Sequence, residues 1–211
     1  MRRHSAKPNK ESNGVKATIK HILSPQTDME HRFISDYKHL EKMVRTFKQM
    51  GYRVVLTQGV YDLIHEGHAV YLEAAKSQGD VLIVGVDSDE LTRKRKGPER
   101  PIVPEGERLK MLLHLRHVDI VTLRQVNHDL GYLIRLVKPD VLVVSKSTKD
   151  FTDAMVREYK SVCGKIVSLP PQATTTTSAR IRNLTIEGAE KLAREVSVLT
   201  HEFLTNIRQK K

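Results

Sequence analysis

Five short apolar segments, alternating with stretches of helical periodicity, constrain the fold of this chain more than any other feature. The second of them, Val81–Val86, is a run without a charged or hydrogen-bonding side chain. Such a run is typical of a strand buried on both faces of a parallel sheet. Strands that alternate with helices imply right-handed crossovers, so we predict an α/β fold with a doubly wound, five-stranded parallel sheet. The expected strands are Arg53–Thr57, Val81–Val86, Val118–Thr122, Val141–Val144 and Ile166–Leu169.

Helical segments fill the space between these strands and extend the chain at both ends. The apolar residues of Thr27–Met50 recur at helical spacing, and Gly51 ends this predicted leading helix. We expect residues 1–26 to be a flexible basic tail, residues 27–186 to be the domain, and residues 187–211 to be a C-terminal helix with a basic tail. The other expected helices are Gly67–Ser77, Pro104–Arg116, Asp129–Val137 and Phe151–Ser161.

Polar residues gather where the first strand is expected to end, and doubly wound sheets bind ligands at the carboxyl ends of their strands. A turn at Gly59 leads to His65 and His68, which stand where a helical pattern begins. Positions three apart lie about 300° around a helix, so both rings can face one phosphate. Because a helix N-terminus also attracts anions, the segment predicts a site for anionic oxygen, with a triphosphate as the natural ligand.

Motifs for other chemistries are absent from the sequence. The zinc pattern H-E-x-x-H needs a histidine at position 69, where the chain has Ala69. No Walker A loop occurs, and no G-x-G-x-x-G follows the first strand. A single cysteine, Cys163, excludes a disulfide framework and a multi-cysteine zinc site, and we predict no protein-bound metal. The alternative to a binding site is that two surface histidines cap a helix.

Two further blocks have the composition of phosphate-binding segments. The basic residues of Arg93–Pro101 follow the second strand and predict a loop able to fold over a triphosphate, although a solvated charged surface has the same composition. The block Thr174–Arg182 has hydroxyls at a helix start and arginines one turn later, which suits β- and γ-phosphates. A linker or a helix cap would have the same composition. The register leaves open whether Arg180 or Arg182 faces the ligand.

The segment Thr57–His68, TQGVYDLIHEGH, resembles the T-x-G-x-F-D-x-x-H-x-G-H signature of the cytidylyltransferase-like nucleotidyltransferases, with Tyr61 in place of Phe. The closest similarity is to the heptose-1-phosphate adenylyltransferase domain. This resemblance implies a Rossmann-like sheet and an enzyme that transfers a nucleoside monophosphate, AMP from ATP rather than CMP, to a phosphorylated small molecule such as a sugar phosphate, with release of pyrophosphate. It runs from Glu30 to Leu184 and includes Gly85–Asp89 (GVDSD), Lys96–Ile102 (KGPERPI) and the pair Glu107–Arg108.

The same resemblance implies roles for individual residues. His65, His68 and Lys96 are the expected catalytic residues, with the histidines stabilising charge on the α-phosphate. Asp62, Asp87 and Arg108 are expected at the substrate, and Mg²⁺ is expected to arrive with the nucleotide. The expected nucleotide-binding residues are Thr57, Gln58, Gly59, Val60, Tyr61, Gly67, Thr176, Thr177, Ser178, Arg180 and Arg182.

Two segments depart from the family patterns. The cytidylyltransferases carry R-T-E-G-I-S-T-T where this chain has Leu169–Ala173 before its threonines, and this difference favours ATP. The heptose domain's K-G-G-D-Y is replaced by Ser145–Lys149, so we expect the acceptor pocket to differ from that of the heptose enzymes. A cytidylyltransferase for a polyol or alcohol phosphate is the alternative enzyme.

The net charge of +11 fits either a polyanionic small molecule or a nucleic acid. Tryptophan is absent and aromatic residues make up 5%, so a stacking surface for single strands is not expected and nucleic acid is disfavoured. A non-catalytic nucleotide- or RNA-binding protein on the same fold is the competing class. No apolar run reaches the ~18 residues of a membrane span, and no apolar segment of a secretory signal follows MRRHSAKPNK. We therefore expect a cytoplasmic protein without membrane contact and, from the family, a homodimer.

Overall fold

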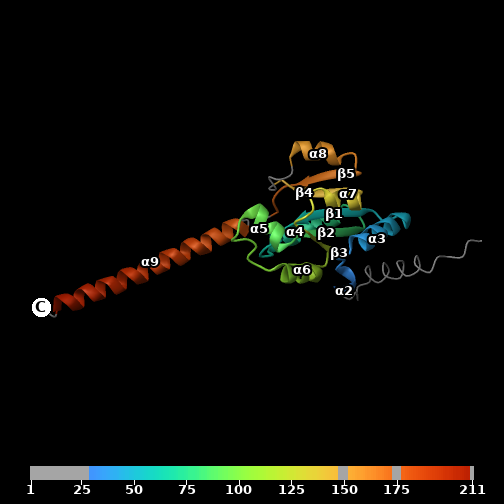
Figure 1. The fold of residues 1–211 in the computed structure, drawn as a ribbon. Coiled ribbons are helices and arrows are strands. Elements are labelled where there is room, and N and C mark those ends of the chain that lie inside the picture. The colour runs from blue at the N-terminus through green and yellow to red at the C-terminus, as the bar shows by residue number, and fades with distance from the viewer. Residues whose placement is uncertain (1–28, 147–151, 173–176, 210–211) are drawn as a thin grey trace, which may run out of the picture. The chain divides into compact units, whose positions relative to one another are not determined.

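A computed structural model describes residues 29–146, 152–172 and 177–209 of the chain (Figure 1). Its described strands form a single parallel sheet of five strands in the order β3-β2-β1-β4-β5. The sheet confirms the predicted fold class, and β1 lies at the point where the strand order reverses, between β2 and β4. The strands are β1 (Val54–Gly59), β2 (Val81–Asp87), β3 (Ile120–Arg124), β4 (Val141–Ser145) and β5 (Lys165–Leu169).

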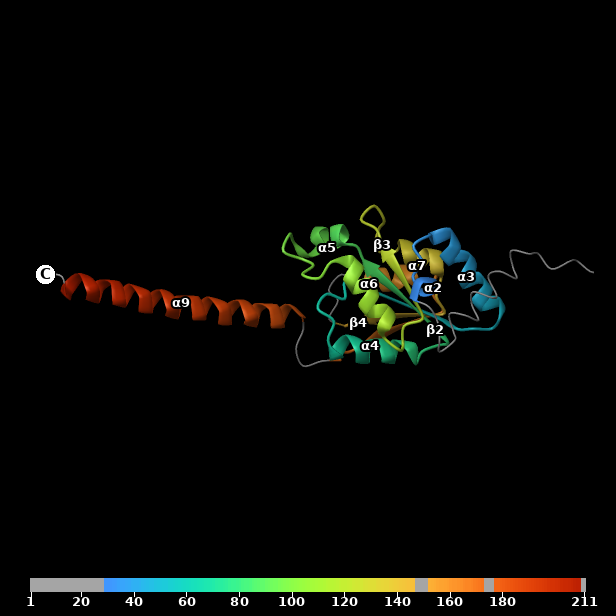
Figure 2. The same ribbon diagram turned by 90° about the horizontal axis from the view of Figure 1, so that it is seen from below.

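Helices cover both faces of the sheet, because alternate side chains of each strand point to opposite sides. Val54 and Leu56 of β1 pack in one core with residues of α3 (Tyr37–Gln49), α7 (Tyr132–Val137) and α8 (Asp153–Tyr159). Val55 of β1 packs in the other core with α4 (Glu66–Lys76) and α6 (Glu105–His114). Figure 2 shows α4 on the opposite side of the strands from α3 and α7. Two apolar layers therefore hold β1, which leads into the histidines, in the middle of the domain.

The predicted single helix over Thr27–Met50 is wrong within its described part. The structure has two helices, α2 (Met29–Arg32) and α3, with an extended link between them. In this link Phe33 bridges to Val121 of β3, and the Ile34 N–H donates to the Val121 carbonyl at 2.9 Å. Since β3 is an edge strand, its unpaired backbone groups compete with the helix for hydrogen bonds. Apolar spacing alone does not show this competition.

A second correction concerns the basic block Arg93–Pro101, which was predicted to be a loop. Its first part belongs to a helix, α5 (Asp89–Lys96), and Gly97 ends that helix with φ of 97°. The Ser88 side chain caps the helix by accepting from the Leu91 N–H at 3.1 Å. Acidic residues in the first turn and basic residues in the last turn match the helix dipole. The order of charges in Ser88–Lys96, acidic first and basic last, therefore indicates a helix.

The described chain divides after Gln172 into two compact units, and each is considered by itself. The second unit holds α9 (Thr177–Gln209), one continuous helix that contains the predicted boundary at residue 186. Where the functional domain ends stays a prediction. Within the described ranges, no helix is both long enough and apolar enough to cross a membrane.

Candidate active site

The loop that joins β1 to α4 has a constrained backbone. Two of its residues, Tyr61 and Leu63, have φ of 55° and 45°, in the left-handed region. This conformation raises the free energy of a residue other than glycine by roughly 1–3 kcal/mol, so surrounding contacts must hold it. We call residues 60–68 the histidine loop.

Asp62 supplies several of these contacts. Its side chain is almost fully buried and accepts the backbone N–H groups of Ile102 and Val103, each at 2.9 Å. The Arg100 guanidinium completes the arrangement with an ion pair of 2.8 Å. Asp62 therefore ties the histidine loop to the segment that follows α5.

Arg108 fixes the same loop from α6. Its side chain is buried, its Nη1 donates to the Val60 carbonyl, and its Nε donates to the Val103 carbonyl at 2.9 Å. Its Nη2 pairs with Asp89 at 2.7 Å. Asp62 and Arg108 were predicted at the substrate, and their contacts in the structure are with the protein. Direct substrate contact by either residue stays a prediction.

Both histidines cap α4 through the same ring atom. The Gly67 N–H donates to Nδ1 of His65 at 3.1 Å, and the His65 N–H donates to Nδ1 of His68 at 3.3 Å. A neutral imidazole that accepts at Nδ1 carries its proton on Nε2. The rings lie close together, with centroids 4.2 Å apart. Two neighbouring imidazoles can therefore present Nε2–H groups as donors.

His68 stays neutral at physiological pH. Burial and the neighbouring His65 lower the pKa of His68 to about 4. Its Nε2 then donates a hydrogen bond to an anion without carrying a full positive charge. Capping and anion binding are compatible, because the cap uses Nδ1 and the ligand would use Nε2.

Other predicted nucleotide-binding residues surround the end of β1. Thr57 is buried, and its hydroxyl lies 2.8 Å from that of Tyr71, which donates to the Val143 carbonyl. Tyr61 is also buried, and its ring centroid lies 5.7 Å from that of His68. A Cβ at Gly59 would come within 3.1 Å of the Tyr61 ring. Thr57 thus contacts protein groups, and Gly59 gives the tyrosine room. Val60 and Gly67 are buried in the same loop.

Asp87 is fully buried at the carboxyl end of β2 and accepts hydrogen bonds from two arginines. Arg124 Nη1 donates to its Oδ1 at 2.7 Å, and Arg95 Nη1 donates to its Oδ2. We call Asp87, Arg95 and Arg124 the arginine–aspartate cluster. Because both carboxylate oxygens are engaged, Asp87 is a poor ligand for a metal ion and a good support for an arginine.

Sequence reasoning missed Arg124. The predicted third strand stopped at Thr122, whereas β3 continues to Arg124, which pairs with Asp87 in register. Carrying the strand two residues further would have placed this arginine at the ligand-binding edge. Burial lowers the pKa of Arg124, and Asp87 opposes that shift.

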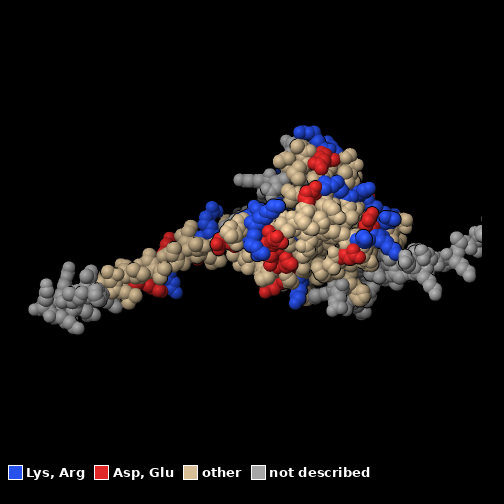
Figure 3. Space-filling view, in the orientation of Figure 1, with Lys and Arg blue, Asp and Glu red and all other residues tan. Residues whose placement is uncertain are grey.

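Lys96 lies exposed in the last turn of α5. Basic side chains gather over this helix in Figure 3, beside acidic ones. The exposure of Lys96 and the charges around it do not test its predicted catalytic role.

The threonine block belongs to the second unit. Thr177, Ser178, Arg180 and Arg182 lie in the first two turns of α9, and Thr176 falls outside the described residues. The choice between Arg180 and Arg182 therefore stays open.

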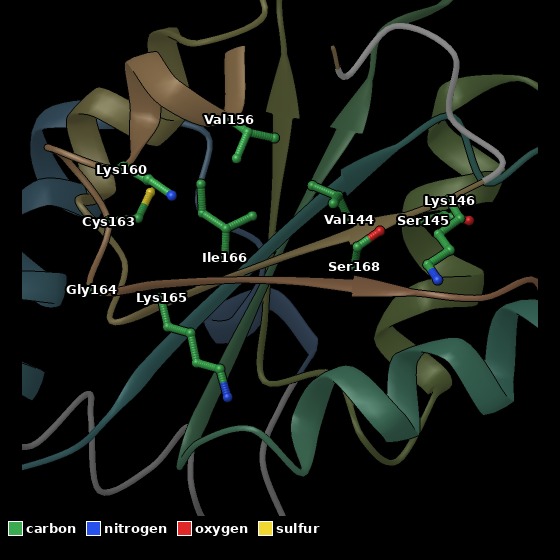
Figure 4. Close-up of a pocket in the computed structure, with 10 residues that line it drawn as sticks. All are labelled: Val144, Ser145, Lys146, Val156, Lys160, Cys163, Gly164, Lys165, Ile166 and Ser168. Carbon is green, nitrogen blue, oxygen red and sulfur yellow. The ribbon is translucent and has the colours of Figure 1, made fainter. Parts of the chain in front are cut away.

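A hollow of about 890 Å³ lies apart from the histidine loop, over β4, β5 and α8 (Figure 4). Ser145 and Lys146, from the segment expected to alter the acceptor pocket, line it, whereas none of the residues predicted for catalysis, nucleotide binding or substrate binding does. Over the described ranges, no group of three His, Cys, Asp or Glu side chains is arranged to hold a metal ion.

Comparison with known proteins gives a match along most of the domain. Residues 56–196 match the sequence model of a family described as cytidylyltransferase-like. The bifunctional protein HldE of Desulfatibacillum aliphaticivorans is 36% identical over 165 residues, 78% of this chain and 33% of that protein. HldE of Nitratiruptor sp. is 44% identical over 112 residues, 53% of this chain and 24% of that protein. The chain thus spans a third or less of the length of these relatives.

Solved structures give similar matches. The lipopolysaccharide core biosynthesis protein from Thermoplasma volcanium is 31% identical with a TM-score of 0.50, over 56% of this chain and 97% of that one. Pantoate-β-alanine ligase from Francisella tularensis has a TM-score of 0.52 over 75% of this chain and 76% of that one. At 18% identity, the ligase supports the fold alone.

Proposed function

Since the chain belongs to the cytidylyltransferase-like family, we propose that it transfers AMP from ATP to a phosphorylated small molecule, with a sugar phosphate as the acceptor class. Pyrophosphate is the second product. The observation that carries this proposal is the pair of Nε2–H donors on His65 and His68, fixed at the start of α4. The similarity to HldE, whose C-terminal domain is the heptose-1-phosphate adenylyltransferase, supports AMP over CMP as the transferred group.

The reaction needs one displacement at phosphorus. An acceptor phosphate oxygen forms a bond to the α-phosphorus of ATP, and the bond from that phosphorus to the bridging oxygen of the β-phosphate breaks. The electron pair of that bond leaves with pyrophosphate. Such a transfer needs positioning and charge stabilisation, without a covalent enzyme intermediate. Donors aimed at the α-phosphoryl oxygens strengthen as charge develops there.

Neutral imidazoles give this stabilisation in a directional form. Both Nδ1 atoms are held by backbone N–H groups, so each Nε2–H has a fixed direction. Positive charge then comes from Lys96 and from Mg²⁺ bound to the triphosphate, and a contribution from Arg180 or Arg182 stays a prediction of the sequence. The cation supplies charge neutralisation when bound, and its ligands would be mainly nucleotide phosphates because Asp87 is occupied by arginines.

Asp62 and Arg108 act in this proposal as positioning residues. They hold the histidine loop against the segment at 100–103 and keep the two rings at the start of α4. A homodimer, a cytoplasmic location and the absence of a nucleic-acid partner are further proposals that rest on family resemblance and composition.

Two substitutions of His68 separate capping from catalysis. The Asn side chain can place an oxygen near the position of Nδ1 and keep the cap, but it has no donor at Nε2. The Gln side chain can place its amide nitrogen near Nε2. We expect His68→Asn to fold normally and to lose ~10²–10³-fold in kcat, and His68→Gln to retain more activity.

Pyrophosphate release would be measured with ATP or CTP and a panel of sugar phosphates. The matched control is His114→Asn on the exposed end of α6, which should behave as wild type. A folded His68→Asn protein with wild-type turnover would refute the role of the histidine pair. Faster turnover with CTP than with ATP would refute the nucleotide assignment.

A further inference from the structure

Strand register places polar residues on one face of the sheet, at the carboxyl ends of β1, β2 and β3. Leu56, Ile83 and Ile120 pair in register and share the core with α3 and α7. Side chains two residues further along each strand return to this face. The next two rows there are Gln58, Gly85 and Thr122, and then Asp87 and Arg124.

Gly85 lets Arg124 lie across β2. A Cβ at position 85 would be 3.1 Å from Arg124 Cδ and 2.5 Å from Leu133 Cδ2. The aliphatic part of Arg124 therefore runs back over Gly85, the residue that pairs with Gln58 in register. Asp87 holds Nη1 of this arginine at 2.7 Å. Since a guanidinium has five N–H donors, Asp87 orients Arg124 while it engages only part of its donor capacity.

Gln58 contributes a hydrogen-bond acceptor that has no partner among the described residues. Its Oε1 atom is buried and unpaired within the part of the chain that the structure describes, while the residue as a whole is partly exposed. Buried polar atoms are nearly always paired, and an unpaired one is unfavourable. An amide oxygen only accepts hydrogen bonds, so the missing group is a donor such as a hydroxyl.

We propose that Gln58 and Arg124 recognise hydroxyl groups of the acceptor, so that a polyhydroxylated phosphate ester binds better than a phosphate ester without hydroxyls. One ligand O–H donates to Gln58 Oε1, and a neighbouring ligand oxygen accepts from the Arg124 guanidinium. Asp87 positions the arginine, and Gly85 gives it room. This subsite begins one residue before the end of β1, which leads directly into the histidine loop. The inference rests on the proposed function, because it takes the acceptor to be a phosphorylated small molecule.

Equilibrium binding tests the subsite without any turnover. Isothermal titration calorimetry on the full chain, saturated with a non-hydrolysable ATP analogue and Mg²⁺, compares a panel of hexose and heptose 1-phosphates with methyl phosphate. We expect at least one sugar phosphate to bind about 10- to 100-fold tighter than methyl phosphate. Gln58→Leu should abolish this preference and leave the Kd of methyl phosphate unchanged. Gln58 was predicted from the sequence to bind the nucleotide, so a weaker Kd of the ATP analogue in this variant would favour that role instead.

Stability controls separate recognition from folding. Because Oε1 of Gln58 has no partner in the described part of the chain, Gln58→Leu should not lower the melting temperature. Gln125→Leu, at an exposed position just after β3, is the matched control and should keep the sugar preference. Arg124→Gln should also lose that preference, with Asp87 still paired to Arg95.

Three outcomes would overturn the subsite: a wild-type protein that does not prefer sugar phosphates, a Gln58→Leu protein that keeps the preference, or a Gln58→Leu protein that loses the ATP analogue instead. Absence of pyrophosphate release with every acceptor would refute the proposed reaction. That result would leave the binding preference as an independent measurement.

Discussion

The histidine loop and the arginine–aspartate cluster lie at neighbouring strand ends but are built from contacts of different range. The caps of the histidine loop join residues two and three positions apart. The ion pairs of the cluster join residues 8 and 37 positions apart. The first set can form as soon as α4 begins, whereas the second exists only when β2, β3 and α5 are packed together. The ring pair is thus a local device, and the proposed acceptor subsite depends on the whole sheet.

Asp62, like Arg108, ties the histidine loop to residues far along the chain. Removing the charge of Asp62 should have a greater effect than any other substitution proposed. Asp62→Asn leaves the Arg100 guanidinium without its buried carboxylate and weakens two buried N–H contacts. Breaking a buried ion pair in this way lowers the free energy of unfolding by about 3–5 kcal/mol. Urea denaturation would measure this loss.

The control is Asp129→Asn, which removes an exposed partner of Arg135 and should change stability by about 0–1 kcal/mol. Equal effects of the two substitutions would mean that the histidine loop is held by its own local contacts.

The same difference in range decided what the sequence could predict. The T-x-G-x-[FY]-D-x-x-H-x-G-H segment is contiguous, so His65 and His68 were found together, and the family match over residues 56–196 confirms the resemblance. The parallel sheet was also recoverable, because apolar runs such as Val81–Val86 are local signals. The strand order and its register were not, since they depend on which strands pair.

Competition between local and distant contacts explains the errors. Phe33 has the spacing of a helical residue, but the edge of β3 offers it a backbone partner. Arg124 looked like part of a loop because a charged residue ends an apolar run, yet Asp87 on the neighbouring strand makes its burial favourable. The partners that decide both cases lie 37 or more residues away in the sequence.

Substitutions of His65 test the local contacts of the histidine loop. His65→Ala removes both the acceptor for the Gly67 N–H and the Nε2–H donor, whereas His65→Asn restores the acceptor. We expect both variants to lose ~10²–10³-fold in kcat. Only His65→Ala should lose about 1 kcal/mol of stability as well, because it lacks the cap. If His65→Asn regains turnover together with stability, the ring acts as a cap and nothing more.

Gly85→Ala tests the arginine–aspartate cluster, whose contacts join residues far apart in the sequence. The new methyl group would overlap Leu133 and press on Arg124, so we expect a loss of about 1–3 kcal/mol in the free energy of unfolding. The KM for the acceptor should rise with little change in the KM for ATP, since Arg124 is displaced. Gly106→Ala on α6 is the control, because a Cβ there meets nothing within 4 Å and should stabilise the helix. A normal acceptor KM in a folded Gly85→Ala protein would separate Arg124 from acceptor binding.

A last expected effect, confined to acidic pH, is a pH dependence of stability that belongs to the histidine loop alone. The pKa of His68 is lowered to about 4 in the folded chain by burial and by His65, against an ordinary value of 6.5. Between these two values the unfolded chain binds more protons, so stability is full above pH 6.5 and is lost as the pH falls toward 4. Carboxylates titrate in part of the same window, and for that reason the melting temperature is compared between wild type and His68→Asn at each pH. Below pH 6.5 the melting temperature of the wild type should fall relative to that of His68→Asn. A constant difference between the two melting temperatures would show that His68 is not held neutral by its surroundings.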